Sequence, residues 1–331
     1  MIKKVCLFFA LLCMTMCLSG CTTYLKDDKN QVIKEATTGQ SLVSNILCQP
    51  TDKNVIKTYE KNGVDIESLP KCSEFTPAAG KYNGIWEALF VKPLSFIIIN
   101  IGKILGNYGL SIIIVTIIIR LIILPISKKS AMQSEGLKLA QKDLEKLEVK
   151  YRNRVSQEDQ MLKAQEMMGI YKKYNINPAS GCLFAFIQLP LFLVFLESLN
   201  RLPIIFEGTF LGFKLGTTPF TALFGESFNL SNFASSFSNG NWIYLILPIL
   251  VALATIFSFK FNSGVSGSEE QQKAMKLTMN IMIVFIVFAS FGMSTSINIY
   301  WIVGSLFTII QMAIIRRSKN GDNKKRSKKA R

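Results

Sequence analysis

Long apolar runs separated by polar connections dominate the chain from about residue 84 onward. The first complete run, Tyr108 to Ile126, is apolar apart from Thr116 and Arg120. As a helix it would extend roughly 28 Å at 1.5 Å per residue, which is enough to cross a bilayer. Further apolar runs cover residues 181–199, 242–259, 277–292 and 297–315. The pattern predicts an all-α membrane protein with five transmembrane helices, the last two joined by a tight turn around Gly292 to Ser296.

The apolar segment 84–107 has a different pattern. Lys92, Ser95, Lys103 and Asn107 recur at close to helical spacing and would form a polar stripe along one face. A helix of this kind favours the membrane interface over a spanning position. We therefore expect an interfacial amphipathic helix here.

Between the first two spans, residues 127–178 carry two amphipathic patterns that predict an antiparallel helical hairpin. The apolar positions, three and four residues apart, are Leu137, Ala140, Leu144, Leu147 and Tyr151, followed by Met161, Ala164, Met168 and Tyr171. Ser156 followed by Asp159 resembles a capping box that opens the second helix. Pro178 limits its end, because the residue before proline avoids helical geometry.

The amino-terminal residues 1–20 combine a positive start, a short apolar run and small residues at the end, which is typical of a signal peptide. Leu18-Ser19-Gly20-Cys21 resembles the lipobox of bacterial lipoproteins, so we expect Cys21 to be acylated outside the membrane. The alternative is an ordinary signal peptide or an uncleaved span. Residues 21–83 are polar with little periodicity and are expected to form an extracytoplasmic lipid-anchored tether or a small module.

Charge tests this topology. Lys and Arg total 38 against 22 Asp and Glu, which in a soluble protein would suggest nucleic acid as partner, but 49% hydrophobic residues indicate a membrane protein. The segment 127–180 and the tail 316–331 are rich in lysine, whereas the outer loop 200–241 carries only Arg201 and Lys214. Positive charge concentrates on the cytoplasmic side of membrane proteins. The hairpin, the connection 260–276 and the carboxyl terminus should therefore be cytoplasmic.

Arg120 is the most informative candidate for function. An arginine within a span costs about 2.5–3.5 kcal/mol on insertion scales and cannot lose its proton. It would lie roughly 9 Å from the inner end of the span. Its side chain either snorkels to the cytoplasmic headgroups or lines a water-filled cavity open to the cytoplasm. Thr116, one turn outward on the same face, would extend that polar wall.

Charged partners for Arg120 are scarce in the sequence. Glu197 is expected near the outer end of the second span, too far away, and no Asp occurs in any span. Arg120 would thus be open to the negative charge of another protein. The other polar or amphipathic groups that could line the same cavity are Gln188, Asn298, Tyr300, Trp301, Ser305 and Gln311. Hydrogen bonding between helices explains Gln188 equally well, and Ser305 and Gln311 better.

Four stretches carry a resemblance to a known family. They read TIIIRLIILPIS, MGIYKKYNINPASGCLFAFIQLPLF, LPILVALATIF and INIYWIVGSLFTIIQ, in this order. With them the chain resembles the YidC family of membrane insertases in its Gram-positive lipoprotein form. The resemblance implies five spans around a hydrophilic groove that is open to the cytoplasm and to lipid. It also implies that Arg120 is the groove arginine, Thr116 its neighbour, and that Gln188, Tyr300 and Trp301 lie near the groove or its substrate-contacting helices.

Two departures from the family pattern concern detailed contacts. The turn FGMSTSINIYW stands where the family commonly has a turn of the Phe-Pro kind, and Phe184 stands where it has a proline. The implied function is insertion and folding of nascent membrane proteins in the bacterial cytoplasmic membrane, alone or with the Sec translocase. The basic tail KKRSKKAR would contact ribosomal RNA or anionic lipid, with lipid slightly favoured.

Other classes of function fit less well. A small-solute or ion transporter is the alternative, but such proteins carry binding groups near the midplane on broken or repeated helices. The chain has no histidine and no Walker motif, so we expect no covalent catalysis, no metal and no cofactor. Cys48 and Cys72 remain outside the membrane after the signal peptide is removed, and they could form a disulfide or stay free.

Overall fold

The computed structural model describes residues 22–80, 82–154, 156–177, 180–225, 240–262 and 269–329. The expected signal peptide and Cys21 lie outside these ranges, as does Pro178. The described chain is mostly helical, and its only strands are the short antiparallel pair β1 (Thr209–Phe210) and β2 (Phe213–Lys214).

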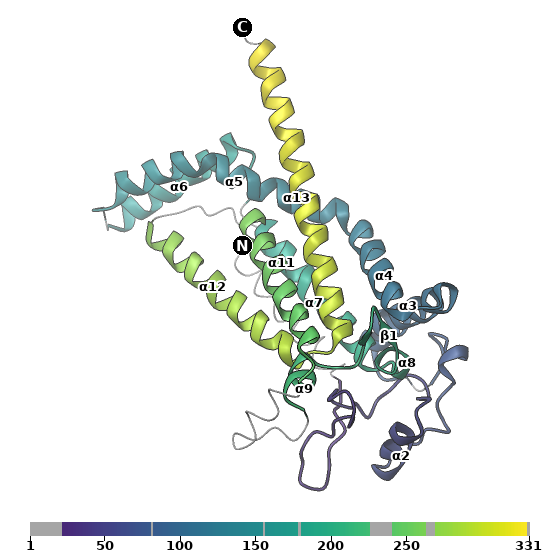
Figure 1. Cartoon of the computed structure of the whole chain (residues 1–331). Helices are drawn as coiled ribbons and strands as arrows, with labels where there is room; N and C mark the ends of the chain where they lie inside the picture. The colour runs from purple at the N-terminus through teal and green to yellow at the C-terminus, as the bar shows by residue number, and fades with distance from the viewer. Residues whose placement is uncertain are drawn as a thin grey trace.

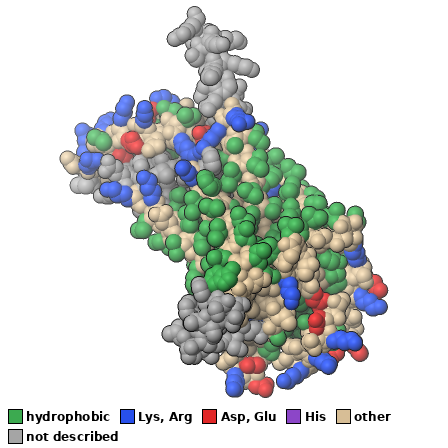
Figure 2. Space-filling model, viewed as in Figure 1, with side chains coloured by type: hydrophobic (Ala, Val, Ile, Leu, Met, Phe, Trp, Pro, Cys, Tyr) green, Lys and Arg blue, Asp and Glu red, His purple; other side chains and the backbone are tan. Residues whose placement is uncertain are grey.

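A bundle of long apolar helices forms the centre of the molecule (Figure 1). Its members are α4 (Tyr108–Ile122), α7 (Ser180–Asn200), α11 (Ile246–Asn262), α12 (Glu269–Gly292) and α13 (Thr295–Lys329). Helix α3 (Lys92–Leu105) lies beside α4 at the side of this bundle (Figure 1). Helix α13 packs against both α4 and α11, while α12 packs mainly on α11. On the face seen in Figure 2, apolar side chains gather across the middle of the molecule, and charged side chains lie toward its two ends. This distribution suits a protein that crosses a membrane.

Length and composition identify the candidate spans. Within the described residues, three helical segments are long and apolar enough to cross a membrane: Glu87–Leu105, Trp242–Lys260 and Thr295–Arg317. A fourth results if Tyr108–Ile122 and Leu124–Tyr151, which meet at a bend of 64°, count as one broken span. The chain is therefore a multi-pass membrane protein. The five-span layout stays a prediction.

The helix of the first predicted span ends four residues before the predicted bound of that span. Helix α4 stops at Ile122, not at Ile126, and α5 (Leu124–Tyr151) begins directly after the bend. Pro125 lies in the first turn of α5. A proline fits there because the amide that it lacks would have no partner within the helix. Residues 124–126, predicted as the end of the first span, thus form the start of α5.

The polar stripe predicted for residues 84–107 faces other parts of the protein. A short π-helical segment (Glu87–Val91) leads into α3, in which Lys92 and Ser95 are buried. Lys103 donates a hydrogen bond to the Ser73 carbonyl. The side chain of Asn107 caps α4 by accepting from the Leu110 amide at 3.1 Å. The position of this helix relative to the membrane stays a prediction.

The polar segment after the bend forms the predicted hairpin of α5 and α6 (Gln157–Lys173). The Asp159 amide donates to Ser156 Oγ at 3.1 Å, so α6 begins at the predicted cap. Ala140 and Leu144 of α5 are buried in the seam, as predicted.

In α6, the predicted apolar seam is wrong at Met161, Ala164 and Met168 and is confirmed at Tyr171. Met161 and Met168 are exposed, whereas Met167 packs on the buried residues of α5. Lys163 and Glu166 form ion pairs with side chains of α5 at 2.7 and 2.6 Å. Because these pairs hold that face of α6 against α5, the two predicted methionines turn outward.

Glu166 of α6 accepts two hydrogen bonds from α5. Lys150 Nζ and Tyr151 Oη donate to Glu166 at 2.6 and 2.8 Å. These hydrogen bonds hold the pKa of Glu166 below its ordinary value. On the same helices, Lys173 pairs with Asp143 at 2.7 Å. Several polar contacts therefore fix the rotation of α6.

Residues 22–80, expected as a tether or a small module, form a folded module with its own core. The core consists of Leu25, Leu42, Val43, Ile46, Val55, Tyr59 and Ile66, and it also contains Phe206 from α8 (Pro203–Phe206). Helix α2 (Lys53–Lys61) and four isolated β-bridges complete the module. A disulfide joins Cys48 to Cys72, whose Cα atoms are 4.8 Å apart.

The module is docked on the loop that follows α7. The Leu47 amide donates to the Arg201 carbonyl at 3.0 Å, and the Thr218 amide donates to the Thr38 carbonyl at 3.1 Å. Thr218 caps the short helix α9 (Pro219–Phe224) within this loop. A 3₁₀ turn (Trp242–Leu245) then leads into α11. Long-range backbone contacts thus join the module to the helical bundle.

The tight turn predicted between the last two spans is confirmed, since α12 ends at Gly292 and α13 begins at Thr295. The Asn298 side chain donates to the carbonyls of Ser290, Met293 and Ser294 at 3.1 Å each. Asn298 therefore satisfies backbone groups of the turn, and its amide does not line a polar cavity with Arg120 as the sequence suggested.

Candidate functional site

Arg120 lies in the last turn of α4 and faces the interior of the bundle, with only 6% of its surface exposed. Its Nη1 donates to Oε1 of Gln188 on α7 at 2.9 Å. No carboxylate among the described residues forms an ion pair with it. The snorkelling alternative does not describe this buried side chain, whose observed partner is a neutral amide.

Tyr300 of α13 adds a second polar group to this region. Its ring stacks on Phe195 of α7 with the centroids 4.1 Å apart, and its phenol lies near Arg120. Both Tyr300 Oη and Arg120 Nε are buried, and neither has a hydrogen-bond partner within the described part of the chain. A buried polar atom without a partner is costly and calls for a reason. The hydrogen-bonding capacity of these two atoms is thus not used by the described residues in this conformation.

Thr116 lies on the same helix as Arg120, as predicted, but its hydroxyl is already satisfied. The side chain is almost fully buried, and Oγ1 donates to the Ile112 carbonyl of its own helix at 2.6 Å. This back-bonding is common for threonine within a helix. Thr116 therefore adds little polarity to the surroundings of Arg120 in this conformation.

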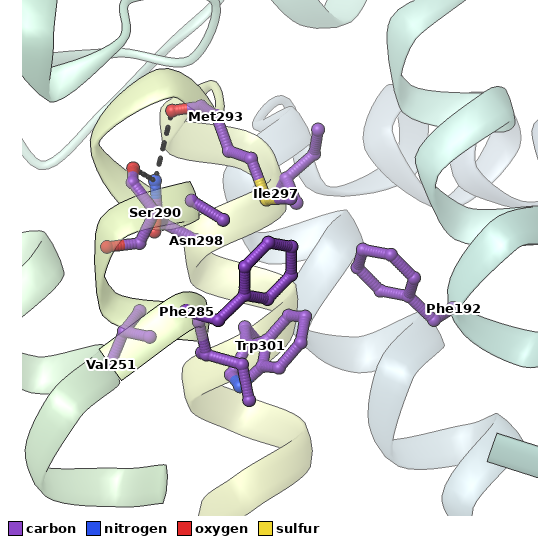
Figure 3. A pocket seen from close by; sticks show the side chains of 10 residues that line it. Phe192, Val251, Phe285, Ser290, Met293, Ile297, Asn298 and Trp301 are labelled. Atoms are coloured by element: carbon purple, nitrogen blue, oxygen red, sulfur yellow. Dashed lines mark hydrogen bonds between the residues drawn. The ribbon is translucent and has the colours of Figure 1, made fainter. Parts of the chain in front are cut away.

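Trp301 takes part in a separate, apolar environment. Its indole N–H donates to Thr255 Oγ1 of α11 at 3.2 Å, and its ring meets Phe192 edge-on at 5.1 Å. Trp301, Phe285 and Met293 help to line a cavity of about 70 Å³ (Figure 3). The adjacent residues Tyr300 and Trp301 thus face different parts of the bundle: Tyr300 lies near Arg120, and Trp301 lines the apolar cavity.

Nearer the basic end of α13, Gln311 exchanges hydrogen bonds with Ser127 at 3.1 and 3.3 Å. This contact joins α13 to α5. The sequence favoured hydrogen bonding between helices for Gln311, and the structure confirms it. Arg316, one turn further along, pairs with Glu135 at 3.4 Å.

At the other end of the bundle, Glu197 takes part in a buried ion cluster, defined here by Glu87, Lys92, Glu197 and Arg201. Arg201 pairs with Glu87 and lies 3.8 Å from Glu197, and Lys92 lies 3.4 Å from Glu87. Trp86 donates to Glu197 at 3.1 Å. Glu197 is therefore engaged by Arg201 rather than Arg120, and the cluster balances two cations with two carboxylates.

Sequence reasoning missed Gly304, which lies on α13 against Arg120. A Cβ atom built on this glycine would be 2.6 Å from Arg120 Nη2. A glycine inside an otherwise apolar helical run was the available signal, because glycine weakens a helix interior and often marks a close approach.

Comparison with known proteins gives consistent findings. The family model described as 60Kd inner membrane protein matches residues 100–324, which is more than half of the chain. Membrane protein insertase YidC 2 of Bacillus anthracis is 32% identical over 247 residues, covering 74% of this chain and 87% of that protein. Membrane protein insertase MisCA of Bacillus subtilis (strain 168) is 33% identical over 232 residues, covering 70% and 79%. Membrane protein insertase YidC of Alkalihalophilus pseudofirmus is 33% identical over 238 residues, covering 71% and 83%.

Proposed function

The chain belongs to the 60Kd inner membrane protein family of membrane protein insertases, and we propose that Arg120 supplies the positive charge with which it receives polar segments of its substrates. Its substrates are nascent membrane proteins, and its place is the cytoplasmic membrane. Family membership favours this function over the transporter considered as the alternative.

The proposed layout has five spans, built on α4, α7, α11, α12 and α13, around a groove open to the cytoplasm. Helix α3 lies in the interface, and residues 1–20 are a signal peptide whose removal leaves Cys21 lipid-anchored outside. The α5–α6 hairpin and the basic tail are cytoplasmic. The lysine-rich composition of both segments supports this orientation. Partners at these segments would be the Sec translocase, and the ribosome or anionic lipid.

In the proposed mechanism, a short hydrophilic segment of the substrate enters beside Arg120. The guanidinium replaces part of the hydration that this segment loses, and it attracts acidic side chains. The adjoining apolar segment then moves into lipid, and burial of its apolar surface drives the step. The membrane potential assists an acidic segment that moves outward. No nucleotide is needed for this sequence of events.

The contrast between two buried arginines carries the proposal. Arg201 contacts two carboxylates, Glu87 and Glu197, and so is neutralised within the protein. Arg120 is equally hidden from solvent, but its hydrogen-bond partner is the neutral amide of Gln188. A buried cation without a counter-ion is unfavourable for folding, which makes it a candidate for function. The counter-ion would come from the substrate.

The test uses purified protein in liposomes and a small single-span substrate with an acidic outer segment. Insertion is read by protease protection for wild type, Arg120→Lys and Arg120→Ala. We expect Ala to fail and Lys to restore most of the protection, because both cations attract a carboxylate. Arg317→Ala is the matched control, since it removes an exposed arginine from the same protein.

Two outcomes would overturn parts of the proposal. Equal protection by all variants, above the level of empty liposomes, would leave the insertase in place and refute the role of the Arg120 charge. Protection by wild type no greater than that of empty liposomes would contradict insertion by this chain alone.

A further inference from the structure

Gly304 occupies an interior position of α13 at which any side chain would meet Arg120. The Cβ of an alanine there would lie 2.6 Å from Nη2 and 3.4 Å from both Cζ and Nε of Arg120. The first of these distances is shorter than real Cβ contacts allow. Gly304 itself is buried, and α13 packs closely on α4 at this level. The absence of a side chain is therefore a condition for the observed position of the guanidinium.

The three distances also give the direction of the clash. The built Cβ is equally far from Cζ and Nε and closer to Nη2. It therefore lies in front of the edge of the guanidinium that is formed by Nε and Nη2. A methyl group at that point would push this edge away from α13. On the opposite side, Nη1 is held by Gln188 of α7 at 2.9 Å. The guanidinium thus lies between a hydrogen-bond acceptor on one helix and an open backbone position on another.

We propose that Gly304 is a positioning residue for Arg120: its missing side chain lets the guanidinium edge formed by Nε and Nη2 approach the α13 backbone while Nη1 keeps its bond to Gln188. The inference rests on the proposed role of the Arg120 charge. A guanidinium binds a carboxylate through a rigid, planar set of donors, so its orientation matters as much as its charge. Gly304 would set that orientation.

The proposal predicts that Gly304→Ala acts through the guanidinium and through nothing else on α13. Alanine otherwise favours a helix, so the substitution should not weaken α13 by itself. We expect insertion of a substrate with an acidic outer segment to fall about tenfold, the scale of one lost charge-assisted hydrogen bond. Insertion of a matched substrate with a neutral outer segment should change less than about twofold.

The decisive experiment combines Gly304→Ala with Arg120→Lys. Lysine keeps the charge but has no Nη2 for the new methyl group to meet. If Gly304 acts by positioning the guanidinium, the double variant should insert the acidic substrate as well as Arg120→Lys alone does. Gly292→Ala is the matched control, because a Cβ at Gly292 meets nothing within 4 Å. It should insert both substrates like wild type.

Each other outcome has a definite meaning. An equal loss from Gly304→Ala in the wild-type and Arg120→Lys backgrounds would show that Gly304 serves helix packing, and it would overturn the inference. So would wild-type insertion by Gly304→Ala. If Arg120→Ala itself inserts the acidic substrate normally, the proposed function fails first. If Arg120→Ala is defective and Gly304→Ala is not, only the positioning role fails.

Discussion

Gln188→Glu would place a carboxylate beside Arg120 with almost no change of shape. Gln188 Oε1 accepts from Arg120 Nη1 at 2.9 Å, and glutamate keeps this oxygen while replacing the amide nitrogen with a second one. The substitution therefore supplies internally the counter-ion that, under the proposed function, the substrate brings. Helix packing and the size of the side chain stay the same, so the change isolates charge.

The size of the effect follows from the geometry. Opposite unit charges about 4 Å apart attract by about 4 kcal/mol at an effective dielectric constant of about 20. Desolvation of the new carboxylate offsets much of this gain. A net preference of about 1.5–3 kcal/mol, typical of a hydrogen bond to a charged group, corresponds to a loss of roughly ten- to hundredfold in the interaction with a competing substrate carboxylate. Insertion of acidic segments should fall within that range.

The assay compares two single-span substrates that differ only in the charge of the outer segment, again by protease protection in liposomes. Gln188→Glu should impair the acidic substrate and leave the neutral one near the wild-type level. Gln311→Glu is the matched control, because it introduces the same carboxylate on α13 beside Ser127 rather than beside Arg120. Normal insertion of the acidic substrate by a folded Gln188→Glu protein would refute the reasoning, since an internally neutralised Arg120 would then suffice.

Further predictions concern the parts that support this site. Replacing Cys48 and Cys72 by serine should lower stability by about 3 kcal/mol, the usual scale for a disulfide, as measured by thermal unfolding in detergent. In the same assay Arg201→Met should destabilise the protein by about 3–5 kcal/mol, because it leaves the two buried carboxylates of the ion cluster with Lys92 as their one cation, whereas Arg120→Leu should raise the melting temperature. The hydrogen bonds to Glu166 lower the pKa of its carboxyl group. They therefore stabilise the hairpin fully at pH values above the pKa of Glu166 in the unfolded chain. This stability is lost as the pH falls through the lower pKa of the folded state. Protection of the hairpin amides from exchange, relative to their intrinsic rates, should therefore decrease on acidification below about pH 4.3, and Glu166→Gln should reduce this pH dependence.

The elements of the fold that depend on local pattern could be predicted from the sequence. The apolar runs fixed the approximate helices, and Ser156 marked the start of α6 because a cap is a contact within one turn. The rotation of α6 could not be predicted in this way. Met167 and Met168 are adjacent and equally apolar, so the sequence does not tell which of them faces α5. The ion pairs between α6 and α5 decide that Met167 does.

Features built from long-range contacts lay beyond the sequence pattern. Residues 22–80 show little periodicity, yet they fold because Phe206 enters their core and because Leu47 bonds to the backbone of Arg201. At the candidate site, the isolation of Arg120 from acidic residues could be inferred from the positions of Asp and Glu along the sequence. Its contact with Gly304 could not, since it depends on how closely α4 and α13 approach.

The two buried arginines show how one chain separates structural charge from functional charge. Around Arg201 the protein supplies two carboxylates, so the desolvation of each charge is offset within the folded state. Around Arg120 it supplies one amide oxygen and removes a side chain at Gly304, which provides space without neutralising the charge. Stability alone would favour filling or neutralising such a position. That the bundle instead keeps Arg120 buried, oriented and charged is understandable if the missing interaction is made with a substrate that is present only during insertion.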